Sequence, residues 1–369
     1  MRERLRSLPL RALTPALALV MIGSGAVILV AEGAQDGPST LPPLRIGGAG
    51  LTAIDLDGPP RAVAVGGGQV WALAEDGAGG SLLQIDPQTN AIVGEPLAFV
   101  PETTGHPIDL AVTDGAVWVV TGANPEDPSE SGPSGLQRVD PVSRQIVATI
   151  GVGADPVDVA LGAGSLWVAN GGDGTVSRVD PASETVVATV PVGQTPREIV
   201  ADARGVWVSV GVNEPSLVRI DPVTNAVAAT LPGLTSASIG TTYVWAVGPG
   251  APNGSVVRVD PTTNQVVDGS FPLDLSPAYV VTLGGGGGVW IAKWFPRPGT
   301  TGASDRDAEP FSGAFEVFRL DPRSMTIATR PLVIDAAPTR PSPGLGALWV
   351  PSRVARAVLR VDPSLVDPA

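Results

Sequence analysis

The sequence predicts an all-β fold, a seven-bladed β-propeller of four-stranded antiparallel blades preceded by an N-terminal transmembrane or signal segment. Three observations predict it: Asp-Pro pairs that recur at a nearly fixed spacing, a tryptophan in each repeat, and short alternating segments separated by glycine-rich turns. Repeats of about 40–45 residues with strand-like content are typical of propeller blades.

The repeated Asp-Pro pairs each follow an aliphatic residue, and four of their six spacings lie between 39 and 41 residues. Their aspartates are Asp86, Asp140, Asp180, Asp221, Asp260, Asp321 and Asp362. The tryptophans, each between two aliphatic residues, are Trp71, Trp118, Trp167, Trp207, Trp245, Trp290 and Trp349. Large aromatic residues repeated in this way indicate a core between blades rather than a binding surface.

Residues 1–31 have the pattern of a signal anchor or a signal peptide. Four arginines among the first 11 residues precede a mainly apolar run, Ala12–Ala31, that is long enough to span a bilayer with its N-terminus inside. The small residues Ser24-Gly25-Ala26 also suit cleavage. Either alternative predicts a protein that is membrane-anchored facing outside the cytoplasm, or secreted, and that contacts the membrane only through this segment.

The remaining chain divides into two parts. Residues 32–50 are rich in Gly, Pro, Ser and Thr, and we expect a flexible linker there. Residues 51–369 contain all the repeats and are expected to form the propeller.

Composition excludes several kinds of function. The chain has no cysteine, which excludes disulfides, thiolate metal sites and a thiol nucleophile, and His106 is its only histidine. A net charge of −13 and a single lysine, Lys293, predict a surface that repels nucleic acid.

The third repeat shows the order of elements within a blade. Short alternating segments over 156–160, 165–169, 175–179 and 185–192 are expected to be its four strands, with glycine-rich turns after the first two. Asp180-Pro181 forms the tight turn before the fourth, because Asp suits the first turn position and Pro the second. Arg178 and Asp180 share one side of a strand, so we expect an internal ion pair in addition to the Asp cap.

The two ends of the repeat region complement each other. Too few residues follow Asp362-Pro363 for a complete fourth strand, whereas an unassigned alternating segment, Leu51–Leu56, precedes the first repeat. Pairing of this segment with the last repeat would close the ring and remove the exposed sheet edges.

The repeat, Pro-x-x-[Val/Ile/Leu]-Ala, then Trp-Val, then Arg-Val-Asp-Pro, resembles the YVTN-type β-propeller repeat proteins, with Trp where that repeat usually has Tyr-Val. It is also similar to the virginiamycin B lyase-like and quinoprotein amine dehydrogenase-like propellers, a superfamily with WD40-like repeats. The resemblance implies the fold far more than a function. Streptogramin lyases of this shape use His and Glu with Mg²⁺, but this chain offers only His106 and, at a comparable position, Glu198. The quinoprotein chemistry would need cysteine.

Polar residues gather where the innermost strands are expected to begin, around one mouth of the central channel. The candidate ligand-binding residues are Asp109, Asp158, Glu198, Tyr279, Arg61, Arg197 and His106. One interpretation is a solvated channel lined by polar side chains. The other is a small-ligand or cation site, for which oxygen ligands would suit Ca²⁺ or Mg²⁺; no other cofactor is expected.

Two insertions, residues 122–135 and 294–313, separate the second and third strands of their repeats and carry several acidic residues. This connection opens on the face where the innermost strands begin. The insertions are therefore expected either to bind an unknown protein or small ligand on that face or to be tolerated extra length.

Taken together, these patterns favour an extracytoplasmic, non-enzymatic binding or scaffold module for an unknown ligand or envelope partner. A lyase or hydrolase acting at the channel mouth is one alternative. The sensor ectodomain of a regulatory system is another.

Overall fold

The computed structural model describes residues 18–22, 26–30, 51–75, 79–123, 133–249, 254–272, 278–282, 289–296, 313–327, 332–334, 340–353 and 355–362. Contacts divide the chain into two units, Met1–Ala49 and Gly50–Ala369. In the first unit, β1 (Ala18–Ile22) pairs antiparallel with β2 (Ala26–Val30).

The second unit consists of antiparallel sheets in chain order. Six of the sheets formed by its described residues are four-stranded. The first is β4 (Pro60–Gly66), β5 (Gln69–Ala74), β6 (Ser81–Ile85) and β7 (Ile92–Ala98). The second is β8 (His106–Thr113), β9 (Ala116–Gly122), β10 (Gly135–Asp140) and β11 (Gln145–Ile150). The third is β12 (Pro156–Gly162), β13 (Ser165–Asn170), β14 (Thr175–Asp180) and β15 (Thr185–Pro191).

The other three follow the same order. The fourth is β16 (Pro196–Ala201), β17 (Val206–Val210), β18 (Ser216–Asp221) and β19 (Ala226–Pro232). The fifth is β20 (Thr235–Ile239), β21 (Val244–Gly248), β22 (Ser255–Asp260) and β23 (Gln265–Pro272). The sixth is β29 (Ser342–Gly344), β30 (Ala347–Ser352), β31 (Ala357–Val361) and β3 (Leu51–Asp55). A short helix, α1 (Pro101–Thr104), links β7 to β8.

A five-stranded sheet stands between the fifth and sixth of these blades. It comprises β24 (Ala278–Thr282), β25 (Val289–Pro296), β26 (Gly313–Asp321), β27 (Thr326–Ile327) and β28 (Leu332–Ile334). The two-residue β27 pairs only with the end of β26, at Leu320 and Asp321, and β28 pairs with the free edge further back, at residues 315–317.

The prediction of seven four-stranded blades preceded by a transmembrane segment is therefore wrong, whereas the alternative of a signal peptide stays a prediction. Among the described residues, six blades are four-stranded, and the sheet that holds Trp290 departs from the pattern because its outer edge is shared by two short strands. No helix in the described part of the chain is long and apolar enough to cross a membrane. The N-terminal apolar run contains β1 and β2 instead, and glycines at positions 23 and 25 of the sequence disfavour a continuous helix there.

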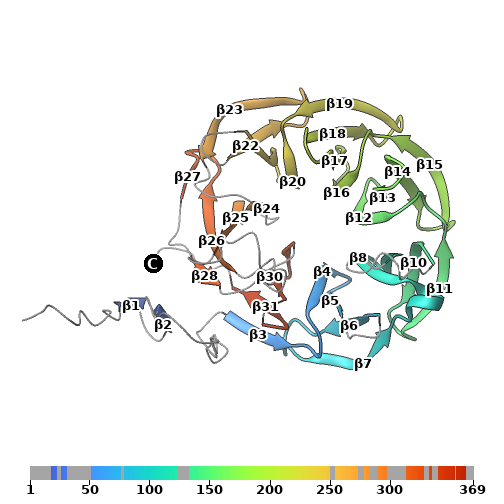
Figure 1. Cartoon of the computed structure of the whole chain (residues 1–369), viewed down its shortest axis with the longest axis horizontal. Coiled ribbons are helices and arrows are strands. Elements are labelled where there is room, and N and C mark those ends of the chain that lie inside the picture. The colour runs from blue at the N-terminus through green and yellow to red at the C-terminus, as the bar shows by residue number, and fades with distance from the viewer. Residues whose placement is uncertain are drawn as a thin grey trace, which may run out of the picture. The chain divides into compact units, whose positions relative to one another are not determined.

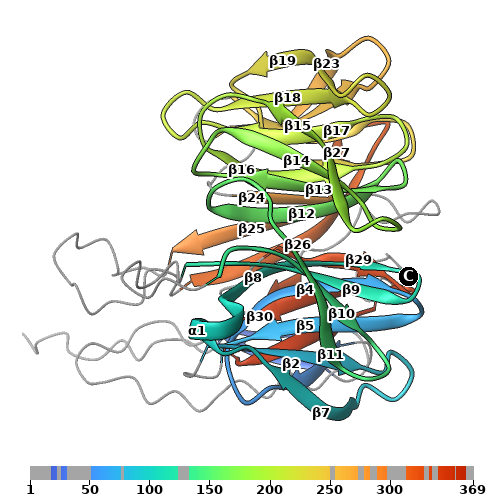
Figure 2. The ribbon, with the colours of Figure 1, turned by 90° about the vertical axis from the view of Figure 1, so that its right-hand side faces the viewer.

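The sheets of the second unit close into a ring. Successive first strands contact one another in the order β4, β8, β12, β16, β20, β24, β29 and back to β4. Figure 1 shows these strands toward the centre and β7, β11, β15, β19 and β23 at the rim, and Figure 2 shows the ring edge-on. The segment Leu51–Asp55 closes the ring by pairing with β31, with Leu51 opposite Val361 and Asp55 opposite Ala357.

The core lies between neighbouring sheets. The seven repeated tryptophans are at most 3% exposed, each on a second strand. Trp167, for example, packs with Ile199 and Val208 of the next blade. These tryptophans are therefore packing residues.

The repeated aspartates cap the turns before the fourth strands. In each of six turns, from Asp86 to Asp321, the Oδ1 atom accepts a backbone N–H two residues ahead, as Asp180 does from Ala182 at 2.9 Å. The residue four positions after each of these aspartates has a positive φ, such as 56° at Glu184. Asp362 ends the last described segment, so its turn lies outside the described residues.

Arg178 does not form the expected ion pair with Asp180 and makes different contacts instead. Arg178 Nη1 donates to Asn225 Oδ1 and to Pro222 O, both at 2.8 Å, in the turn of the next blade, and its guanidinium lies 5.1 Å from the centre of the Trp167 ring. Arg138 likewise reaches Glu184 of the next blade, at 3.2 Å. These arginines join neighbouring blades because a long side chain on a half-buried strand can cross to the next sheet.

Candidate functional site

A cavity of about 450 Å³ lies among the innermost strands and includes residues near the start of several of them. Its walls come from β4, β8, β12, β16, β20 and the segment around β29. The ionisable side chains that line it are Arg61, Asp109, Asp158, Arg197, Glu198 and Arg340. We call this cavity the channel mouth.

β-Bulges at the starts of three successive innermost strands, β8, β12 and β16, place the acidic side chains. The register shifts between Pro107 and Asp109, between Pro156 and Asp158, and between Pro196 and Glu198. Proline has no N–H to give to the sheet, so pairing is interrupted there. Bulges of this kind change the direction of a side chain, which accounts for the same polar position lining the mouth in successive blades.

Each of the three acids is bonded to the next innermost strand. Asp109 Oδ2 accepts the N–H of Val159 at 3.1 Å, and Asp158 Oδ2 accepts the N–H of Ile199 at 2.8 Å. Glu198 is hydrogen-bonded to the hydroxyl of Ser236. The acids therefore hold β8, β12, β16 and β20 together, a structural role that the sequence analysis did not foresee.

Asp158 is the most buried of the acids, with 7% of its surface exposed. Burial, followed by the charge of Asp109, raises the pKa of Asp158 well above its ordinary value of 3.8, although Arg340 acts in the opposite direction. The Asp109 carboxylate is thus a close negative neighbour of Asp158 within the cavity. Burial likewise raises the pKa of Glu198, against the attraction of Arg340.

Arg340 approaches these acids from another part of the ring. It immediately precedes Pro341 and β29, yet its Nη1 donates to Asp158 Oδ2 at 3.1 Å and to Ile199 O at 3.4 Å. On the shorter way round the ring, two innermost strands, β4 and β8, separate β29 from β12. The sequence analysis did not identify this contact, because it joins residues 182 positions apart.

The basic side of the mouth is largely neutralised within the protein. Arg61 Nη2 lies 2.7 Å from Glu75 Oε1, and the same oxygen lies 2.6 Å from Arg353 Nη1. This cluster joins the β4–β7 blade to the blade that closes the ring. Arg61 therefore lines the mouth with part of its charge already engaged.

The other predicted residues are less closely grouped. Arg197 is an exposed member of the lining, at the bulge before Glu198. His106 is buried at the start of β8 and is absent from the cavity wall. Tyr279 lies in β24, but its side chain is outside the described part of the structure. Most of the insertion 122–135, and most of 294–313, also lies outside the described residues.

Metal binding finds little support in this geometry. Within the described segments, no group of three or more His, Cys, Asp or Glu side chains is arranged to hold a metal ion. The carboxylate oxygens of Asp109 and Asp158 instead accept hydrogen bonds from backbone N–H groups, and Asp158 also accepts one from Arg340. Their arrangement suits hydrogen-bond donors better than Ca²⁺ or Mg²⁺, which need six or more oxygen ligands around one point.

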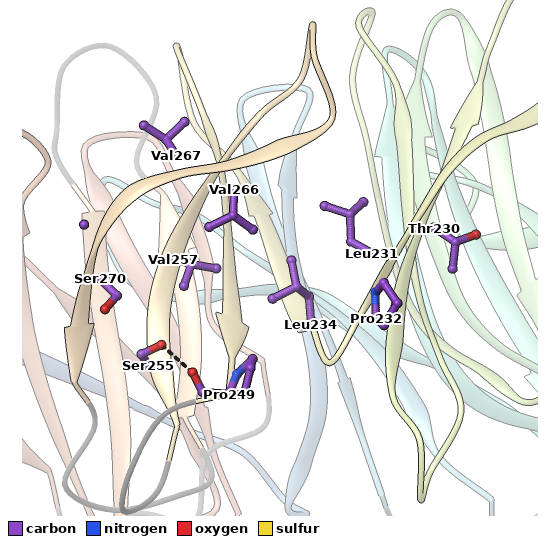
Figure 3. Close-up of a pocket in the computed structure, with 11 residues that line it drawn as sticks. Thr230, Leu231, Pro232, Leu234, Pro249, Ser255, Val257, Val266, Val267 and Ser270 are labelled. Atoms are coloured by element: carbon purple, nitrogen blue, oxygen red, sulfur yellow. Dashed lines mark hydrogen bonds between the residues drawn. The ribbon is translucent and has the colours of Figure 1, made fainter.

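A second cavity, of about 590 Å³, opens at the rim between β19 and the β22–β23 pair. Figure 3 shows Leu231, Pro232 and Leu234 on one side of it and Val257 and Val266 on the other, with Ser255 donating to Pro249 O at 3.0 Å. Although larger, this cavity has no ionisable side chain in its lining. The channel mouth is the better candidate because it gathers charged groups from several blades.

The chain was compared with known proteins. It matches no protein-family model, and no curated protein matches it. Solved structures do resemble it. Hydrazine synthase of Kuenenia stuttgartiensis matches with a TM-score of 0.62 and 15% identity, over 84% of this chain and 97% of that chain. U3-55K matches at 0.57 and 11%, over 85% and 98%, and the computationally designed protein Ika8 at 0.53 and 11%, over 83% and 97%.

The fold is a β-propeller. At these identities the similarity extends to the fold alone. The function of this propeller has to be argued from its own channel mouth.

Proposed function

We propose that this propeller is a non-enzymatic binding module whose working surface is the channel mouth. The observation that carries the proposal is the cavity of about 450 Å³ among the innermost strands, lined by ionisable side chains of both signs. Binding sites are commonly concave, with a few convergent polar groups on a rigid frame. The ligand that fits is a small polar molecule able to donate hydrogen bonds to Asp109 and Glu198.

Rigid placement of the acids supports binding. Asp109 and Asp158 are each held by a backbone N–H of the neighbouring strand, so their positions follow the sheets rather than free side-chain rotation. Such preorganisation reduces the conformational entropy lost when a ligand binds. Burial is the main cause of the raised pKa values of Asp158 and Glu198, so a cationic donor that supplies positive charge and hydrogen bonds would stabilise their ionised forms.

The proposal also concerns where the propeller works relative to the cytoplasm. We infer that the propeller works outside the cytoplasm, as a module for a ligand or an envelope partner. The support is the sequence pattern of basic residues followed by an apolar run in residues 1–31. We also propose that the chain belongs with the YVTN-type propellers, on the strength of its repeated Trp-Val and Arg-x-Asp-Pro motifs.

Isothermal titration calorimetry with three probes of different charge tests the binding proposal: spermidine, succinate and glutamine. We expect spermidine to bind the parent protein, and its Kd to rise about tenfold in an Asp109→Asn/Glu198→Gln variant, which corresponds to about 1.4 kcal/mol. An Asp221→Asn variant, altered in a turn at the rim, serves as the matched control and should bind like the parent. Absence of heat with all three probes, or equal affinity in the mouth variant, would contradict the proposal.

Acid–base chemistry is the second candidate function, and the burial of Asp158 beside Asp109 in the cavity wall favours it. A buried carboxyl group with a raised pKa can serve as a general acid near neutral pH. Assays with p-nitrophenyl acetate and p-nitrophenyl β-glucoside would test this function. Turnover that Asp158→Asn abolishes and Asp180→Asn leaves intact would support it, and equal rates in all three proteins would exclude it for these substrates.

A further inference from the structure

Arg340 lies across the channel mouth. Its backbone belongs to the segment that leads into β29, whereas the groups that its Nη1 contacts, Asp158 Oδ2 and Ile199 O, belong to β12 and β16. Two other innermost strands lie between β29 and β12 on the shorter way round the ring. The side chain also lines the cavity, so it occupies space that a ligand would need.

The two ends of this contact differ in exposure. Asp158 is buried and fixed by the N–H of Ile199, whereas 40% of the Arg340 side chain is exposed. The residue before a proline is confined to extended conformations, so Pro341 holds the Arg340 backbone in place. The guanidinium can therefore leave Asp158 by side-chain rotation alone, without movement of the sheets.

The charged groups around Asp158 determine how strongly its contact with Arg340 is held. The charge of Asp109 from β8 acts on Asp158, and Asp158 in turn acts on Glu198 from β16. Arg340 acts in the opposite direction on both Asp158 and Glu198, and Arg197 acts on Glu198. The guanidinium thus neutralises a buried acidic pair, and its departure without a replacement is unfavourable.

We propose that the Arg340 side chain blocks the channel mouth, so that a ligand can enter only after the contact between Arg340 and Asp158 is broken. We call this side chain the Arg340 bar. This proposal rests on the proposed function in one respect, because the molecule that the Arg340 bar would exclude is a ligand of the channel mouth. Access to the cavity can nevertheless be measured without any ligand, so the two proposals can fail separately.

The chain has no cysteine, so one introduced thiol reports access unambiguously. Ser238 lines the cavity, and Ser238→Cys is a near-isosteric change. The experiment measures the rate at which this thiol reacts with a cationic reagent, methanethiosulfonate ethyltrimethylammonium, and with an anionic one, methanethiosulfonate ethylsulfonate. Both rates are compared between the Ser238→Cys protein and the same protein carrying Arg340→Gln.

If Arg340 blocks the channel mouth, Arg340→Gln should increase the reaction rates of both reagents. The increase should be about tenfold if opening of the mouth limits the reaction in the parent. Removal of a positive charge alone would accelerate the cation and slow the anion. Unchanged rates, or acceleration of the cation only, would overturn the proposal. An Arg353→Gln variant is the matched control: it removes one positive charge held by Glu75 on the same side of the ring, outside the cavity wall, and should leave both rates close to those of the parent.

A second variant covers the case in which Arg340→Gln does not fold. Arg340→Lys keeps the positive charge but loses the planar group that contacts Asp158 and Ile199 together. We expect it to accelerate both reagents by a smaller factor. Rates equal to those of the parent in a folded Arg340→Lys protein would also contradict the bar, and thermal melts monitored by circular dichroism establish folding in each case.

Discussion

At the scale of the residue, Trp167 shows how a repeated position becomes part of the core. Its ring is fully buried, its Nε1 donates to Gly162 O at 3.0 Å, and Arg178 lies against it. Trp167→Ala should lower the free energy of unfolding by about 3–5 kcal/mol, because it leaves a large cavity between two sheets.

Denaturant melts measure this loss. Val223→Ala is the control, since Val223 is 86% exposed in a turn and its truncation should change stability by less than about 0.5 kcal/mol. Equal stability of the two variants would place the Trp167 ring at the surface.

Asp158 makes stability depend on pH in an unusual direction. Its pKa is raised in the folded state, so between the unfolded value of about 3.8 and the folded value the native protein binds more protons than the unfolded chain. The stability that Asp158 contributes is therefore present at low pH and lost as pH rises through its folded pKa. Asp158→Asn should become more stable relative to the parent over that range.

Asp180 is the matched control, because its pKa is lowered in the folded state whereas that of Asp158 is raised. The N–H of Ala182 lowers the pKa of Asp180, so its contribution is lost as pH falls through the folded pKa. Urea melts from pH 3 to pH 8 should show the two Asn variants diverging from the parent in opposite directions. Parallel pH profiles would contradict the environment assigned to Asp158.

At the scale of the element, arginines on several third strands join their blade to a turn of the next blade, as Arg138, Arg178 and Arg258 do. Arg178 in β14 bonds Asn225 Oδ1, which follows β18. A double-mutant cycle with Arg178→Met and Asn225→Gly should give a coupling free energy of about 1 kcal/mol. Glycine is the suitable replacement because Asn225 has a φ of 55°.

The control cycle pairs Arg178→Met with Asn90→Gly, a turn residue of similar conformation in another blade, with a φ of 58°. Those two changes should add within about 0.5 kcal/mol. Additivity in both cycles, measured by denaturant melts, would mean that the contact between Arg178 and Asn225 contributes nothing to stability.

At the scale of the whole molecule, ring closure depends on β3. Leu51, Ile54 and Leu56 are buried in this part of the chain, and β3 pairs with β31 over five residues. Deleting residues 1–57 should lower the melting temperature by roughly 10 °C or more relative to a protein lacking only residues 1–49, since several kcal/mol of apolar burial are lost and two sheet edges are exposed. Equal melting temperatures would show that closure adds no stability.

Local patterns in the sequence were sufficient for the β-propeller fold, the buried tryptophans and the Asp-Pro turns. The turns depend on interactions within one repeat and the buried tryptophans on contacts between adjacent repeats, and the sequence presents the same pattern many times. The departures arose where that pattern was broken: the 61-residue spacing before Asp321 did not reveal that β27 and β28 share one edge, and an apolar N-terminal run did not by itself establish a membrane helix.

The sequence by itself determined that polar residues such as Asp109, Asp158 and Glu198 stand at equivalent positions of successive repeats. Only the tertiary structure decided what they do there: each bonds the neighbouring strand, Asp158 is buried beside Asp109, and Arg340 reaches Asp158 from the segment before β29. The physical reason is that a repeat pattern records what recurs within a blade. A contact across the channel joins residues far apart in the chain, and it exists only after the ring has closed.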